Sequence, residues 1–193
     1  MYSAPFEQAV VAHCSPALTG LKPACLISLS ASEYPRLSRL AAWYTRALER
    51  RGLRFEVLCR CNRRFLLLVY RPARLAGWLA REDVARLLEQ AGYPAGSELS
   101  ALLNHLRRRL LRDSGFPHEI GLFLGYPPKD VLGFLAHRGG GCAFCGYWKV
   151  YHNEQQARRC FQRFDRCRDI LRARLEAGNT LLGLFGGELP AAA

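Results

Sequence analysis

Residues 53–70 read LRFEVLCRCNRRFLLLVY, and this stretch decides the fold. Residues 53–60 alternate between apolar and mostly polar side chains, which predicts a strand with one buried face. After a tight connection, residues 65–70 form a continuous apolar run, as expected of a central strand that is covered on both faces. The two segments therefore predict an antiparallel hairpin at the centre of a sheet.

Further elements flank this hairpin on both sides. Ala24–Leu29 is a short apolar run that predicts a buried strand, and residues 34–48 carry apolar side chains at helical spacing. Short helical segments follow between residues 72 and 136, then a late strand at Tyr147–Tyr151 and a long amphipathic helix. We therefore expect a mixed α/β (α+β) fold. A strand-helix-strand-strand core and one late strand would form a small mixed sheet of about four strands packed by several helices.

Length and hydropathy indicate one soluble domain. The 193 residues predict a single globular domain over residues 1–178, with a poorly ordered C-terminal tail over residues 179–193. The longest apolar run is strand-sized, far below the roughly 20 residues of a membrane helix. The N-terminus lacks the pattern of a signal peptide. We therefore expect a cytoplasmic protein with no membrane partner.

The chain is strongly basic, with a formal net charge of +12. Of its 28 basic residues, 25 are Arg and 3 are Lys. Such a charge raises nucleic acid as a partner. The arginines are expected on helix faces opposite the apolar stripes, without aromatic side chains on which bases would stack. Solvated helix faces are therefore the favoured interpretation, and non-specific nucleic-acid binding is kept as an alternative function.

The most specific local pattern is Cys142-Ala-Phe-Cys145-Gly146. A C-x-x-C-G turn is typical of a metal knuckle, in which two thiolates converge on one ion and the glycine lets backbone N–H groups approach a sulfur. Zinc and iron are the candidate ions. The chain has no second C-x-x-C, so the remaining ligands would come from a homodimer partner, from Cys14 or from Cys61. The same pair is also open to redox chemistry as a dithiol.

His118 and Glu119 are the weak catalytic candidates. A Glu in the first turn of a helix interacts favourably with the helix dipole, which is a structural interpretation. The alternatives are a general acid/base pair of an enzyme that also uses a thiol, or metal ligands near the surface. No recognised catalytic motif accompanies the pair, so enzyme activity stays an open question.

Several segments resemble one protein family. They are Phe116–Pro127 (FPHEIGLFLGYP), Asp130-Val131, Tyr147–Tyr151 (YWKVY), Cys14–Lys22 (CSPALTGLK) and Val69–Leu75 (VYRPARL). On these residues the chain resembles an uncharacterised bacterial domain-of-unknown-function family, found mainly in anaerobic Firmicutes. The resemblance covers nearly the whole chain and implies a one-domain bacterial protein with no assigned activity. Lys22, Tyr147, Trp148 and Lys149 lie in these segments and are further candidate site residues.

The function is therefore unknown at this level, with one leading hypothesis. We expect a cytoplasmic binding or accessory protein with a cysteine-based metal or thiol site at Cys142 and Cys145, linked to iron or redox metabolism. An enzyme built on His118, Glu119 and a thiol, and non-specific nucleic-acid binding through Arg, are the alternatives.

Overall fold

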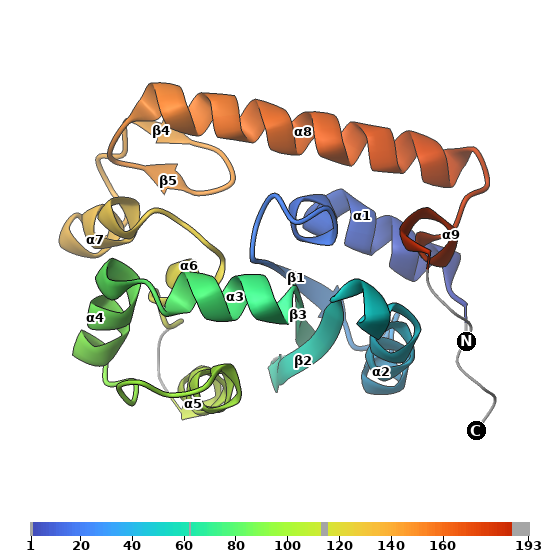
Figure 1. The fold of residues 1–193 in the computed structure, drawn as a ribbon, viewed down its shortest axis with the longest axis horizontal. Helices are drawn as coiled ribbons and strands as arrows, with labels where there is room; N and C mark the ends of the chain where they lie inside the picture. The colour runs from blue at the N-terminus through green and yellow to red at the C-terminus, as the bar shows by residue number, and fades with distance from the viewer. Residues whose placement is uncertain (1, 62, 113–115, 187–193) are drawn as a thin grey trace. The chain divides into compact units, whose positions relative to one another are not determined.

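The computed structural model describes residues 2–61, 63–112 and 116–186 and has a mixed α/β fold (Figure 1). The fold class predicted from the sequence is thereby confirmed. Contacts divide the chain into two compact units. Unit 1 comprises Met1–Arg74 and Cys167–Ala193, and unit 2 comprises Leu75–Arg166. The single domain expected over residues 1–178 stays a prediction.

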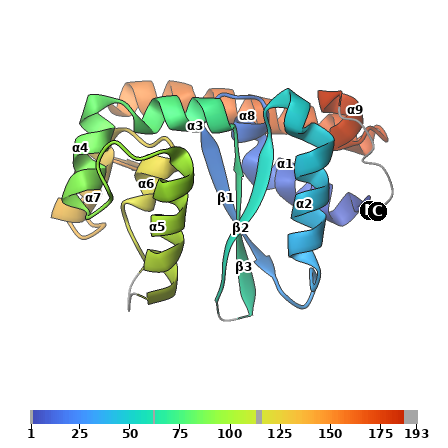
Figure 2. The same cartoon turned by 60° about the horizontal axis from the view of Figure 1, so that its bottom comes forward.

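A three-stranded antiparallel sheet forms the centre of unit 1 (Figure 2). Its strands are β1 (Ala24–Ser30), β2 (Arg54–Cys61) and β3 (Arg64–Tyr70), in the order β1-β3-β2. The central strand is β3, as its continuous apolar run predicts. The hairpin of β2 and β3 is confirmed, with a bulge between Val57 and Cys59.

Helices α1 (Ala4–Leu18) and α2 (Leu37–Leu48) pack on one face of this sheet. A short 3-10 turn, η1 (Glu49–Arg51), follows α2. The core between helices and sheet is built from apolar side chains that include Phe6, Leu37, Phe55 and Leu67. Hydrophobic burial of this kind contributes about 25 cal/mol per Å² of apolar surface.

Helix α1 runs further than the sequence predicts. The sequence predicts a short helix over Phe6–His13, ended by the Pro and Gly of residues 14–20, yet α1 continues to Leu18 with Pro16 inside. Proline removes one intrahelical hydrogen bond, and here this loss falls close to the helix end. The Ser15 hydroxyl donates to the Val11 carbonyl at 2.5 Å, and the Thr19 hydroxyl donates to the Ser15 carbonyl at 2.9 Å. These bonds support the last turn, which carries Cys14.

Part of the expected tail is helical. Leu181–Phe185 form α9, whose Leu181 and Leu182 side chains are buried in the core of unit 1. The backbone N–H of Leu181 donates to the buried carboxylate of Glu7 at 2.8 Å. Residues 187–193 of the expected tail lie outside the described residues.

Unit 2 is mostly helical. It contains α4 (Glu82–Gln90), α5 (Leu99–Arg112), α6 (Ile120–Phe123) and α7 (Pro128–Ala136). Helices α3 (Pro72–Leu79) and α8 (Glu154–Glu176) contribute residues to both units. Within the described part of the chain, every helix is too short or too polar to cross a membrane.

The late strand does not join the main sheet. It is limited to β5 (Lys149–Val150), which pairs with β4 (Phe144–Cys145) in a separate two-stranded antiparallel sheet. The expected single mixed sheet of four strands is therefore replaced by two antiparallel sheets. Closing a short local loop costs less conformational entropy than pairing with a strand far along the chain.

Candidate functional site

Cys142 and Cys145 lie at the β4–β5 hairpin of unit 2. Phe144 pairs with Val150, and Cys145 pairs with Lys149. The Cys145 side chain is exposed and the Cys142 side chain is half-buried. The hairpin therefore presents sulfur to solvent, as a binding site requires.

The glycine of the C-x-x-C-G turn has a packing role. A Cβ at Gly146 would lie only 2.4 Å from the Phe161 ring, so a larger residue does not fit without a shift. The Gly146 N–H donates to the Trp148 carbonyl at 3.1 Å, and the Ala143 N–H donates to the Val150 carbonyl at 2.9 Å. These two amides hold the hairpin and are not directed at a sulfur, unlike those of a metal knuckle.

Tyr151 follows the hairpin and lies close to both thiols. Its hydroxyl oxygen is covered, and no hydrogen-bond partner is found for it among the described residues. Burial raises the pKa of Tyr151, and the nearby Cys142, Asp130 and Cys145 raise it further. Electrostatic interactions weaken with distance, so two thiols that both raise the pKa of one phenol lie close to that phenol. The structure thus places Cys142 and Cys145 within electrostatic range of the Tyr151 hydroxyl.

Asp130 anchors the segment that carries this cluster. Its side chain is 3% exposed. It accepts hydrogen bonds from the Trp148 indole nitrogen at 2.8 Å, the Tyr151 N–H at 2.8 Å and the His152 N–H at 2.9 Å. A buried carboxylate is tolerated when donors satisfy it in this way. Asp130 was not predicted as a functional residue. Its only sequence signal is its place in the resemblance to the family.

The other candidates in this segment have mainly structural contacts. Trp148 is buried on Asp130, and Tyr147 packs on Phe161 and Phe164 while its hydroxyl donates to Asp165 at 3.0 Å. Lys149 donates from Nζ to the Gly139 carbonyl at 2.5 Å. Tyr147 and Trp148 therefore position the hairpin, and Lys149 fixes the preceding glycine loop.

His118 and Glu119 have different surroundings. The Glu119 carboxylate is buried, forms an ion pair with Arg109 Nε at 2.8 Å and accepts a hydrogen bond from the Tyr93 hydroxyl at 3.2 Å. His118 is exposed beside the Phe134 ring, with 4.9 Å between ring centroids. The carboxylate is thus already neutralised, which favours the structural interpretation of Glu119.

Unit 1 contains a second group of thiols. Cys14 on α1 and Cys25 on β1 are both buried, and their thiols hydrogen-bond to each other. That bond, burial and the Cys25 charge raise the pKa of Cys14, whereas the hydrogen bond from Cys14 and the charge of Lys22 lower the pKa of Cys25. Lys22 is buried beside them at 5% exposure. Sequence reasoning named Cys14 and Lys22 but missed Cys25, because it reads as one more apolar residue of a strand.

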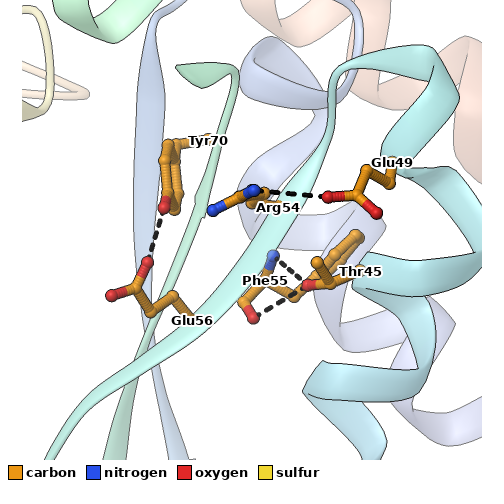
Figure 3. Close-up of polar contacts among 6 residues, drawn as sticks. All are labelled: Thr45, Glu49, Arg54, Phe55, Glu56 and Tyr70. Carbon is orange, nitrogen blue, oxygen red and sulfur yellow. Dashed lines mark hydrogen bonds and ion pairs between the residues drawn. The ribbon is translucent and has the colours of Figure 1, made fainter. Parts of the chain in front are cut away.

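A groove of about 430 Å³ runs between α2 and β2 in unit 1. Figure 3 shows polar contacts of Thr45, Arg54, Phe55 and Glu56, which line this groove. The Thr45 hydroxyl accepts from the Phe55 N–H at 2.9 Å and donates to the Phe55 carbonyl at 3.1 Å, which covers part of the free strand edge. Glu56 accepts from the Tyr70 hydroxyl at 2.5 Å, and burial together with this bond raises the pKa of Tyr70. These contacts join α2 to β2 and β2 to β3, so they have a structural role.

The arginines of α8 agree with solvated helix faces. Arg158 pairs with Glu154 at 2.7 Å and lies over the Phe144 ring at 3.7 Å. Arg172 lies 3.8 Å from Glu176. Exposed pairs of this kind contribute about 0–1 kcal/mol each.

The described residues contain no cluster of three or more His, Cys, Asp and Glu arranged to hold a metal ion. A metal at Cys142 and Cys145 would thus need ligands from elsewhere. Cys14, another candidate ligand, belongs to unit 1, where its thiol bonds to Cys25. The side chain of Cys61, the third candidate, lies outside what the structure describes.

Comparison with known proteins identifies a family but no activity. Comparison with curated proteins finds no match, and neither does comparison with solved structures. The family described as "Protein of unknown function (DUF3793)" matches residues 10–185. This match confirms the resemblance to a domain-of-unknown-function family. The chain therefore belongs to the DUF3793 family.

Proposed function

We propose that the protein is a binding or accessory protein whose site is the bend that carries Cys142 and Cys145, and that its ligand is a thiophilic metal ion, zinc or iron. The observation that supports this most is the position of the two thiols. They lie on one short hairpin, and Cys145 is exposed. Both cysteines also raise the pKa of the buried Tyr151 hydroxyl. Thiolates are the protein ligands that zinc and iron–sulfur centres favour.

A second copy of the chain would complete the coordination. Structural zinc takes four protein ligands, and one hairpin supplies two. Cys145 is exposed to solvent, so the hairpins of two copies can approach each other. The proposed holoprotein is therefore a homodimer with one ion shared by two Cys142–Cys145 bends.

We infer a reducing compartment, the cytoplasm, for this site. None of the seven cysteines whose side chains the structure describes is in a disulfide. Free thiols persist where glutathione and thioredoxin keep them reduced. A link to iron or redox metabolism is part of the proposal, since both processes use thiols of this kind.

The test is metal analysis combined with native mass on anaerobically purified protein. We expect zinc or iron at one ion for two chains, together with a dimer. Cys142→Ser and Cys145→Ser would lose the metal and become monomeric. The matched control is Cys160→Ser, because Cys160 is half-buried on α8 and outside the bend. Metal-free wild-type protein, or a metal content that survives both substitutions, would contradict the proposal. A disulfide in place of metal would instead assign the bend to redox chemistry.

A further inference from the structure

Three sulfur atoms gather at the C-terminal end of α1 in unit 1. Cys14 and Cys25 are 0% and 4% exposed, and their thiols are hydrogen-bonded. The half-buried Cys167 thiol lies 3.2 Å from the Thr19 hydroxyl and donates to the Ser15 carbonyl at 3.5 Å. It is close enough to Cys25 for the two to interact electrostatically. This cluster lies apart in the sequence from Cys142 and Cys145 and does not depend on the function proposed for them.

The groups around Cys25 favour its thiolate form. Its sulfur accepts hydrogen bonds from the Cys14 thiol and from the Ala17 backbone N–H, and the Lys22 charge acts on it. The loop brings Lys22 to this place, since its N–H donates to the Pro16 carbonyl at 2.9 Å. A positive charge beside a thiol stabilises the charged thiolate form. Lys22 therefore lowers the pKa of Cys25.

We propose that Cys14 and Cys25 form a peroxide-responsive pair that converts reversibly between a dithiol and a disulfide. The Cys25 thiolate, which has released its proton to solvent, attacks one oxygen of hydrogen peroxide and the O–O bond breaks. Cys25 becomes a sulfenic acid, and the departing hydroxide takes the proton of the Cys14 thiol and leaves as water. The Cys14 thiolate then attacks the Cys25 sulfur and expels hydroxide, which takes a proton from solvent. Two thiols and one peroxide thus give one disulfide and two waters.

The burial of Cys14 and Cys25 determines which oxidant reaches Cys25 and which thiol then reacts with it. A small neutral peroxide can reach a buried sulfur through local opening of the fold, whereas a protein disulfide cannot. The same burial keeps the sulfenic acid next to Cys14, its hydrogen-bonded neighbour.

Peptide mapping tests the pair directly. Trypsin does not cleave Lys-Pro bonds, so Lys22-Pro23 leaves Cys14 and Cys25 together in the peptide Met1–Arg36. Reduced full-length protein would be treated with hydrogen peroxide, denatured, alkylated and digested. We expect this peptide to carry no alkyl group, to be two hydrogens lighter and to regain both thiols after dithiothreitol. Cys142 and Cys145 fall in a different peptide, Gly139–Lys149, so the two proposals are read separately.

Variants of Lys22 test the mechanism. Lys22→Met should slow disulfide formation roughly tenfold, as for a rise of one pKa unit in the attacking thiol. Lys22→Arg keeps the charge and should restore the rate, and circular dichroism checks that both variants are folded. The proposal would be overturned if Met1–Arg36 stayed doubly alkylated while the exposed Cys145 was oxidised. Equal rates for Lys22→Met and wild type, or a disulfide joining Cys25 to Cys167, would also overturn it.

Discussion

The Trp148 indole nitrogen donates a hydrogen bond of 2.8 Å to the buried carboxylate of Asp130. The backbone N–H groups of Tyr151 and His152 donate to the same carboxylate. Asp130 therefore joins α7 to the β4–β5 hairpin and the residues that follow it. We expect Asp130→Ala to leave three donors without an acceptor and to lower the free energy of unfolding by about 3 kcal/mol or more, at roughly 1–3 kcal/mol for each donor. Urea unfolding measures this loss. Asp169→Ala makes the same chemical change at an exposed position and should cost under about 1 kcal/mol. Equal losses would contradict the anchoring role of Asp130.

Two glycines should respond in opposite directions to alanine. Gly146→Ala places a Cβ 2.4 Å from Phe161 and should destabilise the hairpin by about 1–3 kcal/mol. Gly77 lies in α3, where an added Cβ would meet no atom within 4 Å, so Gly77→Ala should stabilise by about 0.5–1 kcal/mol. Thermal unfolding of both variants decides between these signs. A Gly146→Ala protein as stable as wild type would show that the close approach to Phe161 is not needed.

The buried Glu7 predicts a loss of stability as pH rises. Burial raises the pKa of Glu7 above its ordinary 4.5, against hydrogen bonds from Leu181 and Tyr44 that lower it. A carboxyl with a raised folded-state pKa binds more protons when folded, so its stabilising effect is full below pH 4.5 and is lost as pH rises through the folded-state value.

Glu7→Gln should remove this part of the pH dependence. Its amide oxygen can still accept from the Leu181 N–H, so the fold is retained. Urea unfolding across pH 4.5 to 7 measures the slope of stability against pH, starting from the ordinary pKa of 4.5 and ending at about neutral pH. The exposed Glu49→Gln is the control and should keep the wild-type slope. A Glu7→Gln protein with an unchanged slope would refute the assignment.

Substitutions of Glu119 and His118 should differ in their effect on the free energy of unfolding. Glu119→Gln weakens the ion pair with the partly buried Arg109, and we expect a loss of about 1–3 kcal/mol in the free energy of unfolding. His118→Ala, at an exposed position, should change stability by about 0.5 kcal/mol or less. If Glu119→Gln were neutral for stability, the carboxylate would be free for another role and the enzyme hypothesis would gain support.

The sequence predicts best where the pattern is local. Alternation over residues 53–60 and the apolar run after it define the β2–β3 hairpin. Helix α1 runs past the end that the sequence predicts because its last turn buries Cys14, Ala17 and Leu18 in the core, and this burial offsets the hydrogen bond that Pro16 cannot donate.

Long-range partners account for what the sequence does not show. Asp130 matters through Trp148 and Tyr151, and Cys25 matters through Cys14 and Lys22. Each residue looks ordinary in its own segment, an acid in a first helical turn and a small apolar side chain in a strand. Their roles arise only when the tertiary fold brings the partners together.

Cobalt binding tests the central claim most directly. Co²⁺ can replace zinc or iron, and thiolate ligation gives it a charge-transfer absorption band that oxygen ligands do not give. Anaerobic titration of reduced wild-type protein should produce this band and saturate at one ion for two chains, while Cys145→Ser should lack it and Cys160→Ser should retain it. Wild-type protein without the band, or Cys145→Ser with the full band, would contradict a metal site at Cys142 and Cys145.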